Sequence, residues 1–238
     1  MKVVRRGYLP EYEDYFKGNG LKILKEASKD VIFLLNRGYK VKVATMFVQQ
    51  HYQLSEPQRL ALARSLAAKN DIELRNLKKL DKEDCKDKEV YIDGFNAIIP
   101  MESLLSESPI FECMDDAIRD MANLRGSYHI IDKTPNAIHL LLKELDELKV
   151  KKANIYLDKP ISNSGRLKTL IAEIGEQYNV ELNIELLNAV DKELYGKENV
   201  ISGDCIVLNE CKSWIPLYKW IIDLYEKEHK VWRVNIFN

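Results

Sequence analysis

Apolar side chains in the first part of the chain recur every three to four residues, which is the spacing of amphipathic helices. This spacing predicts helices over residues 21–37 and 40–52. Ser55 is expected to begin a third helix, because its hydroxyl can cap the first turn while Gln58 reaches back, and Pro57 needs no hydrogen-bond partner there. Short connections between the helices predict a compact all-α unit whose last two helices are spaced like a helix-turn-helix.

The pattern changes after a charged run at residues 81–88, which has no apolar periodicity and is the expected linker. Beyond it, short apolar runs alternate with helical patterns, which predicts a mostly parallel sheet sandwiched by helices. The expected strands are residues 89–93, 153–157, 180–187, 200–202 and 231–237, and the expected helices are residues 135–149, 165–178, 213–228 and one starting near Asp204. The predicted domains are therefore residues 1–80, all-α, and residues 89–238, α/β.

Charge is distributed unevenly between these two parts. Residues 1–80 hold sixteen Lys and Arg against eight Asp and Glu, a net of +8, whereas residues 81–238 hold twenty against twenty-nine, a net of −9. A basic part joined to an acidic part is typical of polyanion binding beside an acidic or metal-binding site. Arg59 and Arg64, off the apolar stripe of the third helix, are candidate nucleic-acid contacts. A helical part that only solvates its outer faces with lysine would give the same composition.

Bulk properties exclude several classes of protein. The composition is 46% hydrophobic and 31% charged, as in a globular chain. No stretch has the length and apolarity of a membrane span or a signal peptide, so a cytoplasmic protein without a membrane partner is expected. The four cysteines lack metal-binding spacing and are expected to be free thiols. Glycine-rich nucleotide motifs and a serine nucleophile elbow are absent from the sequence.

Three expected strands end in an aspartate, at Asp93, Asp158 and Asp204. Ligands of parallel sheets bind beyond the carboxyl ends of the strands, and carboxylates gathered there repel one another unless a cation neutralises them. Mg²⁺ and Mn²⁺ prefer carboxylate oxygens and can activate water for phosphodiester cleavage. Each aspartate taken alone is better explained as a cap on the following helix or turn. The three together favour a metal site.

Other acidic side chains compete for a place in that site. Glu102 is nine residues beyond Asp93 and could fold back over the same ion. Asp191 follows an expected strand and has a weaker claim. Residues 112–121 read as a helix, on which Asp116 and Asp120 share a face, and a solvated helix face is the better explanation for this pair.

The loop at residues 160–165 is a candidate phosphate site. Ser162 and Ser164 offer hydroxyl groups, and free backbone N–H groups are expected at the start of the following helix. Arg166 and Arg125 could supplement them. Ordinary helix capping explains the same residues equally well.

Two of the strand-end segments, VYIDGFN and VISGDC, resemble the NYN branch of the PIN-like nucleases. In that branch one strand ends in Asp-Gly-x-Asn, another ends in Ser-Gly-Asp before a helix, and both aspartates hold the metal. The resemblance implies a PIN-like fold, with Asp93 and Asp204 as metal ligands and Asn96 orienting the first. The family usually continues Ser-Gly-Asp with a second acidic residue and a phenylalanine. Residues 205–207 here are Cys-Ile-Val, so one expected carboxylate is missing.

Most of the chain is also similar to an uncharacterised prokaryotic family with a basic helical first part and a PIN-like second part. The segments that carry this resemblance are LLNRGYKVKVATMFVQQHYQLSEPQR, YIDGFNAIIPMESLL and LDKPISNSGRL. The resemblance supports the two-part organisation and assigns no activity.

The sequence therefore predicts a metal-dependent nuclease that uses Mg²⁺ or Mn²⁺, with RNA as the expected substrate and the basic helices holding its phosphate backbone. The alternative is a non-catalytic protein that binds nucleic acid or a nucleotide on the same fold, which the Cys-Ile-Val departure favours. A scaffold protein, whose basic part is only a solvated surface, is a third class.

Overall fold

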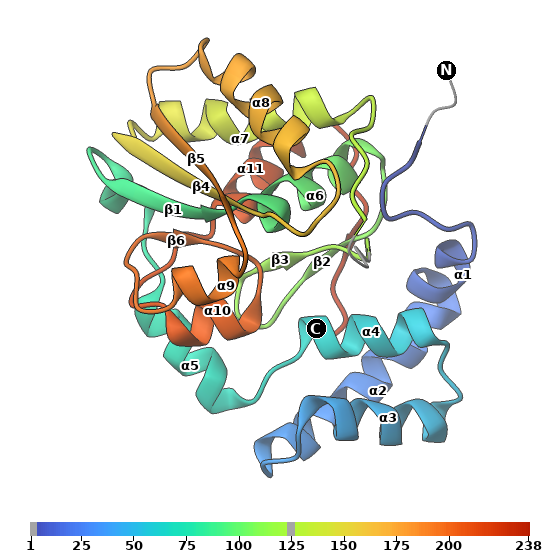
Figure 1. The fold of residues 1–238 in the computed structure, drawn as a ribbon. Helices are drawn as coiled ribbons and strands as arrows, with labels where there is room; N and C mark the ends of the chain where they lie inside the picture. The colour runs from blue at the N-terminus through green and yellow to red at the C-terminus, as the bar shows by residue number, and fades with distance from the viewer. Residues whose placement is uncertain (1–3, 123–126) are drawn as a thin grey trace.

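The computed structural model describes residues 4–122 and 127–238 of the chain. A helical N-terminal part precedes a four-stranded parallel sheet with helices on both faces, and a smaller three-stranded sheet lies between the two (Figure 1). The predicted combination of a helical first part and a mostly parallel, helix-covered sheet is confirmed.

The helical part contains the three expected helices and two more. Its elements are α1 (Tyr12–Phe16), α2 (Gly18–Asn36), α3 (Val41–Tyr52), α4 (Glu56–Ser65) and α5 (Lys69–Lys78). The expected capping box at the start of α4 is present: the backbone N–H of Ser55 donates to Gln58 Oε1 at 3.0 Å, and that of Gln58 donates to Ser55 Oγ at 3.4 Å. Two of the four free N–H groups of this helix start are thereby satisfied.

The main sheet has the strand order β5-β4-β1-β6, with all neighbours parallel. Its strands are β1 (Glu89–Asp93), β4 (Lys152–Asp158), β5 (Glu181–Leu187) and β6 (Val200–Ile201). The chain runs outward from β1 through β4 to β5 and then returns to the other side of β1. Such a reversal opens a crevice at the carboxyl ends of the strands, here between β1 and β6, where open α/β sheets bind their ligands.

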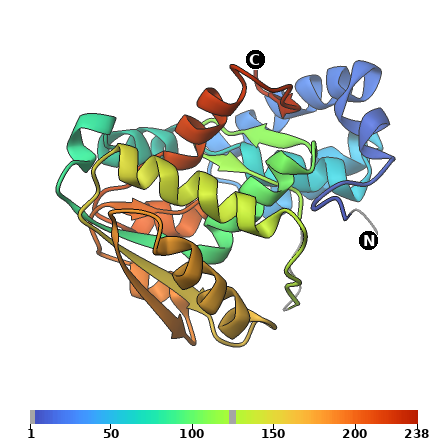
Figure 2. The same cartoon turned by 90° about the horizontal axis from the view of Figure 1, so that it is seen from above.

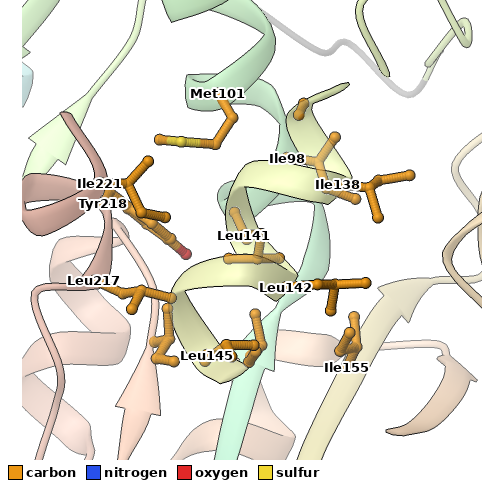
Figure 3. Close-up of a cluster of buried hydrophobic side chains, with 14 of the residues drawn as sticks. Ile98, Met101, Ile138, Leu141, Leu142, Leu145, Ile155, Leu217, Tyr218 and Ile221 are labelled. Atoms are coloured by element: carbon orange, nitrogen blue, oxygen red, sulfur yellow. The ribbon is translucent and has the colours of Figure 1, made fainter. Parts of the chain in front are cut away.

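Helices cover both faces of this sheet because its strands carry apolar side chains alternately on each face. In β1, Val90 and Ile92 face the larger core, and Tyr91 packs on the smaller one. The larger core is formed with α6 (Gly94–Leu105), α7 (Thr134–Glu147), α8 (Ser164–Gly175) and α11 (Leu217–Tyr225), the smaller with α9 (Val190–Leu194) and α10 (Cys205–Glu210). Figure 3 shows α7 in the larger core, with its leucines between α11 and β4.

The smaller sheet has the order β3-β2-β7 and joins the two parts of the molecule (Figure 2). Its strands are β2 (Ile110–Glu112), β3 (Ile118–Arg119) and β7 (Arg233–Val234). Ile110 of β2 packs in the core of the main sheet, whereas Phe111 packs among the helices, with its ring centroid 5.0 Å from that of Phe16. The strand expected at residues 231–237 therefore exists in a shorter form and belongs to this second sheet.

The prediction of a helix over residues 112–121 is wrong, because this segment forms part of the β2–β3 hairpin. Asp116 has φ +62° in the turn, and the backbone N–H of Cys113 donates to the Ala117 carbonyl at 3.1 Å. The Asp115 carboxylate accepts a bond from the Ala117 N–H at 3.2 Å, which stabilises the turn instead of a helix.

The helical part and the C-terminal tail share one core. Val234 and Ile236 are buried with Leu24 and Val31 of α2 in the cluster that also contains Phe111. The expected linker contains a 3₁₀ helix (Lys82–Cys85), whose last residue is fully buried in the main core. The helices therefore depend on residues far along the chain for part of their packing.

Ile236→Ala is expected to lower the free energy of unfolding by about 2–4 kcal/mol, because it leaves a cavity in the core that the tail and the helices share. Urea unfolding of the full chain measures the change, and Asn238→Ala, at the exposed end of the same tail, is the matched control. Equal stabilities for the two variants would contradict a core shared between the tail and the helices.

Candidate functional site

The carboxyl ends of β4, β1 and β6 border a cavity of about 340 Å³. Asp158, Asp93 and Asp204, which end or follow these three strands, all line it. The strands are parallel neighbours, so their ends meet at the same edge of the sheet. The structure thus brings together the three aspartates that the sequence selects.

Two glycines beside the aspartates allow this close approach. A Cβ on Gly94 would lie 2.9 Å from the carbonyl oxygen of Tyr156 in β4, closer than side chains tolerate. A Cβ on Gly203 would lie 3.0 Å from the carbonyl oxygen of Ile118 in β3. The Asp-Gly and Gly-Asp pairs therefore have a packing reason as well as a chemical one.

Asp93 is 2% exposed and caps α6. Its Oδ1 accepts a bond from the Asn96 backbone N–H at 3.2 Å, and its Oδ2 accepts one from the Asn96 side-chain amide. Burial raises the pKa of Asp93 to about 7; the bonds from Asn96 oppose the shift, and the negative charges of Asp191 and Asp158 add to it. A cation in the cavity would favour the ionised form.

Asp204 and Asp158 also serve as caps. Oδ1 of Asp204 accepts bonds from the backbone N–H groups of Ile206 and Val207 at 2.7 and 3.1 Å, and Oδ1 of Asp158 accepts one from Val190 at 3.3 Å. Within the described part of the chain, nothing donates a hydrogen bond to the Oδ2 atom of either aspartate. Capping fixes each carboxylate and leaves its second oxygen available to a ligand.

A cation in this cavity would rely on few protein ligands. Among residues 4–122 and 127–238, no three His, Cys, Asp or Glu side chains form a ready metal-binding group. Mg²⁺ commonly uses only one or two carboxylates and completes its shell with water and substrate phosphate. The free oxygens of Asp204 and Asp158, beside the buried Asp93, fit that mode of binding better than a closed protein cage.

Positive charge reaches the cavity from the helical part. Arg64, near the end of α4, lines it, and its guanidinium donates to the carbonyl oxygen of Asp120. No carboxylate in the described residues lies within ion-pair distance of Arg64. Asp120 lines the cavity too; burial raises the pKa of its carboxyl, and Arg64 opposes that shift. Among the described residues, the cavity thus combines carboxylates with one arginine, Arg64, that is in no close ion pair and interacts with Asp120 only at longer range.

Arg119 holds the walls of the cavity together. Its Nε donates to the Gly203 carbonyl at 2.6 Å, and its Nη1 donates to the Arg64 carbonyl at 2.8 Å. Asp115 neutralises the guanidinium at 2.8 Å and also pairs with Arg75 of α5 at 2.7 Å. One buried charge cluster therefore positions both the Asp204 loop and α4.

Glu102 lies away from the aspartates, although the sequence places it with them as a metal ligand. Its fully buried carboxylate accepts bonds from Arg6 at 2.8 Å, from the Tyr128 hydroxyl at 2.7 Å and from the Thr134 hydroxyl. Asn96, Ile99 and Pro100 of α6 line the cavity, and Glu102 lies on another face of that helix. Its observed partners give it a structural role.

The other candidates are distributed outside the cavity. The Ser162 hydroxyl accepts from the backbone N–H of Tyr128 at 2.9 Å, and that of Ser164 donates to the Lys159 carbonyl at 3.4 Å. Arg166 is exposed beside them. Arg59 pairs with Glu56 on its own helix, and Arg125 lies outside the described residues. Phosphate binding by this second group stays a prediction.

Family comparisons agree with the two-part organisation. Residues 82–220 match the family described as Domain of unknown function (DUF5616), and residues 23–78 match the one described as Protein of unknown function (DUF434). The chain belongs to the DUF5616 family. The uncharacterized protein MJ0935 of Methanocaldococcus jannaschii is 37% identical over 203 residues, which cover 84% of this chain and 94% of that protein. The predicted membership of an uncharacterised two-part family is confirmed. No solved structure matches the chain.

The sequence does not identify Arg119 as part of the site in this DUF5616 chain, and its pattern favours a solvated helix face for Asp120. Both residues reach the cavity through the β2–β3 hairpin, since Asp120 comes directly after β3 and is another strand-end aspartate. The helix expected over residues 112–121 conceals this pattern. Among the described helices, none combines the length and hydropathy that a bilayer-spanning segment requires.

In the metal-free protein, the stability of Asp93→Asn relative to wild type is expected to be higher at about pH 8 than at about pH 5, by about 2–3 kcal/mol. The folded-state pKa, about 7, lies above the ordinary value of 3.8, so ionisation of Asp93 lowers the stability of the wild type as pH rises between these values. Asparagine has no charge to bury and escapes this loss. Urea unfolding in EDTA at both pH values measures the difference, with the exposed Asp14→Asn as control. A stability difference between Asp93→Asn and wild type that does not change with pH would contradict the raised pKa.

Proposed function

We propose that this protein is a metal-dependent nuclease that cleaves RNA in the cavity at the ends of β4, β1 and β6. The observation that carries the proposal is the convergence of Asp93, Asp158 and Asp204 on one cavity together with Arg64. Carboxylates and an arginine meet at one place in phosphoryl-transfer sites because the first hold a divalent cation and the second binds a phosphate.

Each residue has a distinct part in this proposal. Asp204 and Asp158 offer their free Oδ2 atoms to Mg²⁺ or Mn²⁺, and Asp93, held by Asn96, supplies negative charge beneath them. The ion would supply a lowered pKa for a bound water and charge stabilisation for the leaving oxygen. Arg64 would bind a phosphate oxygen of the strand, because the guanidinium keeps donors beyond the one used on Asp120.

The fold of the second part is proposed to be PIN-like, of the NYN branch. The order of the main sheet and the two strand-end motifs support this assignment: VYIDGFN contains the end of β1 and VISGDC contains the end of β6, on adjacent strands.

The four cysteines are free thiols, which suits the proposed location in the cytosol.

The second candidate is a non-catalytic nucleic-acid-binding protein on the same fold. Cys205 favours it, since this residue lines the cavity at the position where the resemblance implies a second acidic side chain. With one carboxylate fewer, the cavity could bind a phosphate through Arg64 without activating water. The two candidate functions differ in whether the bound RNA is cleaved.

The wild type is expected to cleave single-stranded RNA in Mn²⁺, and Asp204→Asn is expected to reduce the rate by about two orders of magnitude, because it removes charge from the proposed ligand while keeping its shape. Gel analysis of a labelled RNA, with Asp14→Asn purified in parallel, measures the effect. Equal cleavage by wild type and Asp204→Asn would assign the activity to a contaminant. Binding of RNA without cleavage by any of these proteins would favour the non-catalytic candidate.

A further inference from the structure

The outer face of α3 carries large apolar side chains in contact with solvent. Val43, Met46 and Phe47 are 54%, 45% and 66% exposed, whereas the residues that α3 buries are the smaller Ala44, Thr45 and Val48. An amphipathic helix ordinarily buries its larger apolar side chains and exposes polar ones. An outward face of this kind marks a surface that binds something.

The segment that carries this face has positively charged side chains and no negatively charged ones. Residues 31–55 contain Arg37, Lys40 and Lys42 but no Asp or Glu. Lys40 and Lys42 are exposed, and in the described part of the chain neither has a carboxylate partner. We define the α3 surface by six residues: Tyr39, Lys40, Lys42, Val43, Met46 and Phe47.

The charges and exposed aromatic rings of the α3 surface indicate what kind of partner binds there. A second copy docked here about a two-fold axis would bring the lysines of both copies together without a carboxylate to neutralise them. A polyanion matches the charge, and exposed aromatic rings between lysines can stack on unpaired bases. Tyr39 and Phe47 are 52% and 66% exposed and can serve as such stacking platforms.

The helix that follows α3 is not free to enter a DNA groove, as the second helix of a helix-turn-helix would. Within α4 only Glu56 is exposed, and Arg64 lines the aspartate cavity. Duplex bases, stacked on one another, would also leave the rings of the α3 surface without partners.

We infer that the α3 surface binds single-stranded nucleic acid, with bases stacked on Phe47 and Tyr39 and phosphates bound by Lys40 and Lys42. The inference rests on the proposed function in one respect: the bound strand would be the substrate that continues toward the cavity. Binding itself requires no metal and no cleavage, so the two proposals fail separately.

The test is fluorescence anisotropy of the full-length protein with labelled oligouridylate and oligothymidylate of about twelve nucleotides, in EDTA. Phe47→Ala is expected to weaken binding roughly tenfold through the lost stacking, and Lys42→Glu is expected to weaken it and to flatten its dependence on salt. Leu77→Ala, which removes another apolar side chain that is 86% exposed, and Lys168→Glu, which changes an exposed lysine of α8, are the matched controls. The two oligonucleotides together show whether the protein distinguishes RNA from DNA, which differ here in the sugar and in the C5 methyl group of the base.

Unchanged affinity in Phe47→Ala and Lys42→Glu would overturn the inference, as would tighter binding of the matching RNA duplex than of the single strand. A concentration-dependent dimer in sedimentation, abolished by Phe47→Ala, would overturn it in favour of a second copy. If Asp204→Asn loses cleavage but keeps this binding, both proposals stand; if no protein cleaves RNA and binding still depends on Phe47, only the proposed nuclease activity fails.

Discussion

The parallel pairing of β1 with both β4 and β6 is the constraint on which the candidate site depends. Asp93 pairs in register with Tyr156 of β4, and Ile92 pairs with Ile201 of β6, so the three strands end at one edge of the sheet. The aspartates that follow them have little freedom to separate, because Asp93 and Asp204 cap the helices that follow them and Asp158 accepts a bond from the first N–H of α9. Like charges are thereby held together by backbone geometry, and a bound cation would offset their repulsion.

The buried cluster of Asp115, Arg75 and Arg119 connects this edge to the helical part. Burial raises the pKa of Asp115, but the two guanidinium groups outweigh it and hold the pKa below its ordinary value, so the cluster is ionised. Through Arg119, the charged cluster fixes the carbonyls of Gly203 and Arg64, two residues that line the cavity. The basic helices are thus an integral wall of the site, and removing one partner of a buried pair would leave an uncompensated charge.

The elements that the sequence predicts correctly are those that neighbouring residues determine. The strand at residues 89–93 and the start of α4 follow from hydrophobic period and capping chemistry, and the structure has both. The hairpin at residues 110–119 could not be predicted in this way, because Asp115 and Arg119 at i, i+4 spacing look like a helical pair until Arg75 supplies the third charge. Glu102 was misplaced since α6 turns it away from the cavity, toward Arg6 and Tyr128. Partners so far apart in the sequence cannot be identified from a short window of neighbouring residues.

We propose that the strand-end aspartates act together as a cation site. Electron paramagnetic resonance of free Mn²⁺, titrated with the wild type and with Asp204→Asn near pH 8, tests it most directly. The account predicts that the wild type depletes the free-ion signal, that Asp204→Asn depletes it far less, and that wild-type affinity falls below about pH 7, where the pKa of Asp93 favours the neutral carboxyl. Equal depletion by the two proteins, or none by the wild type, would contradict it.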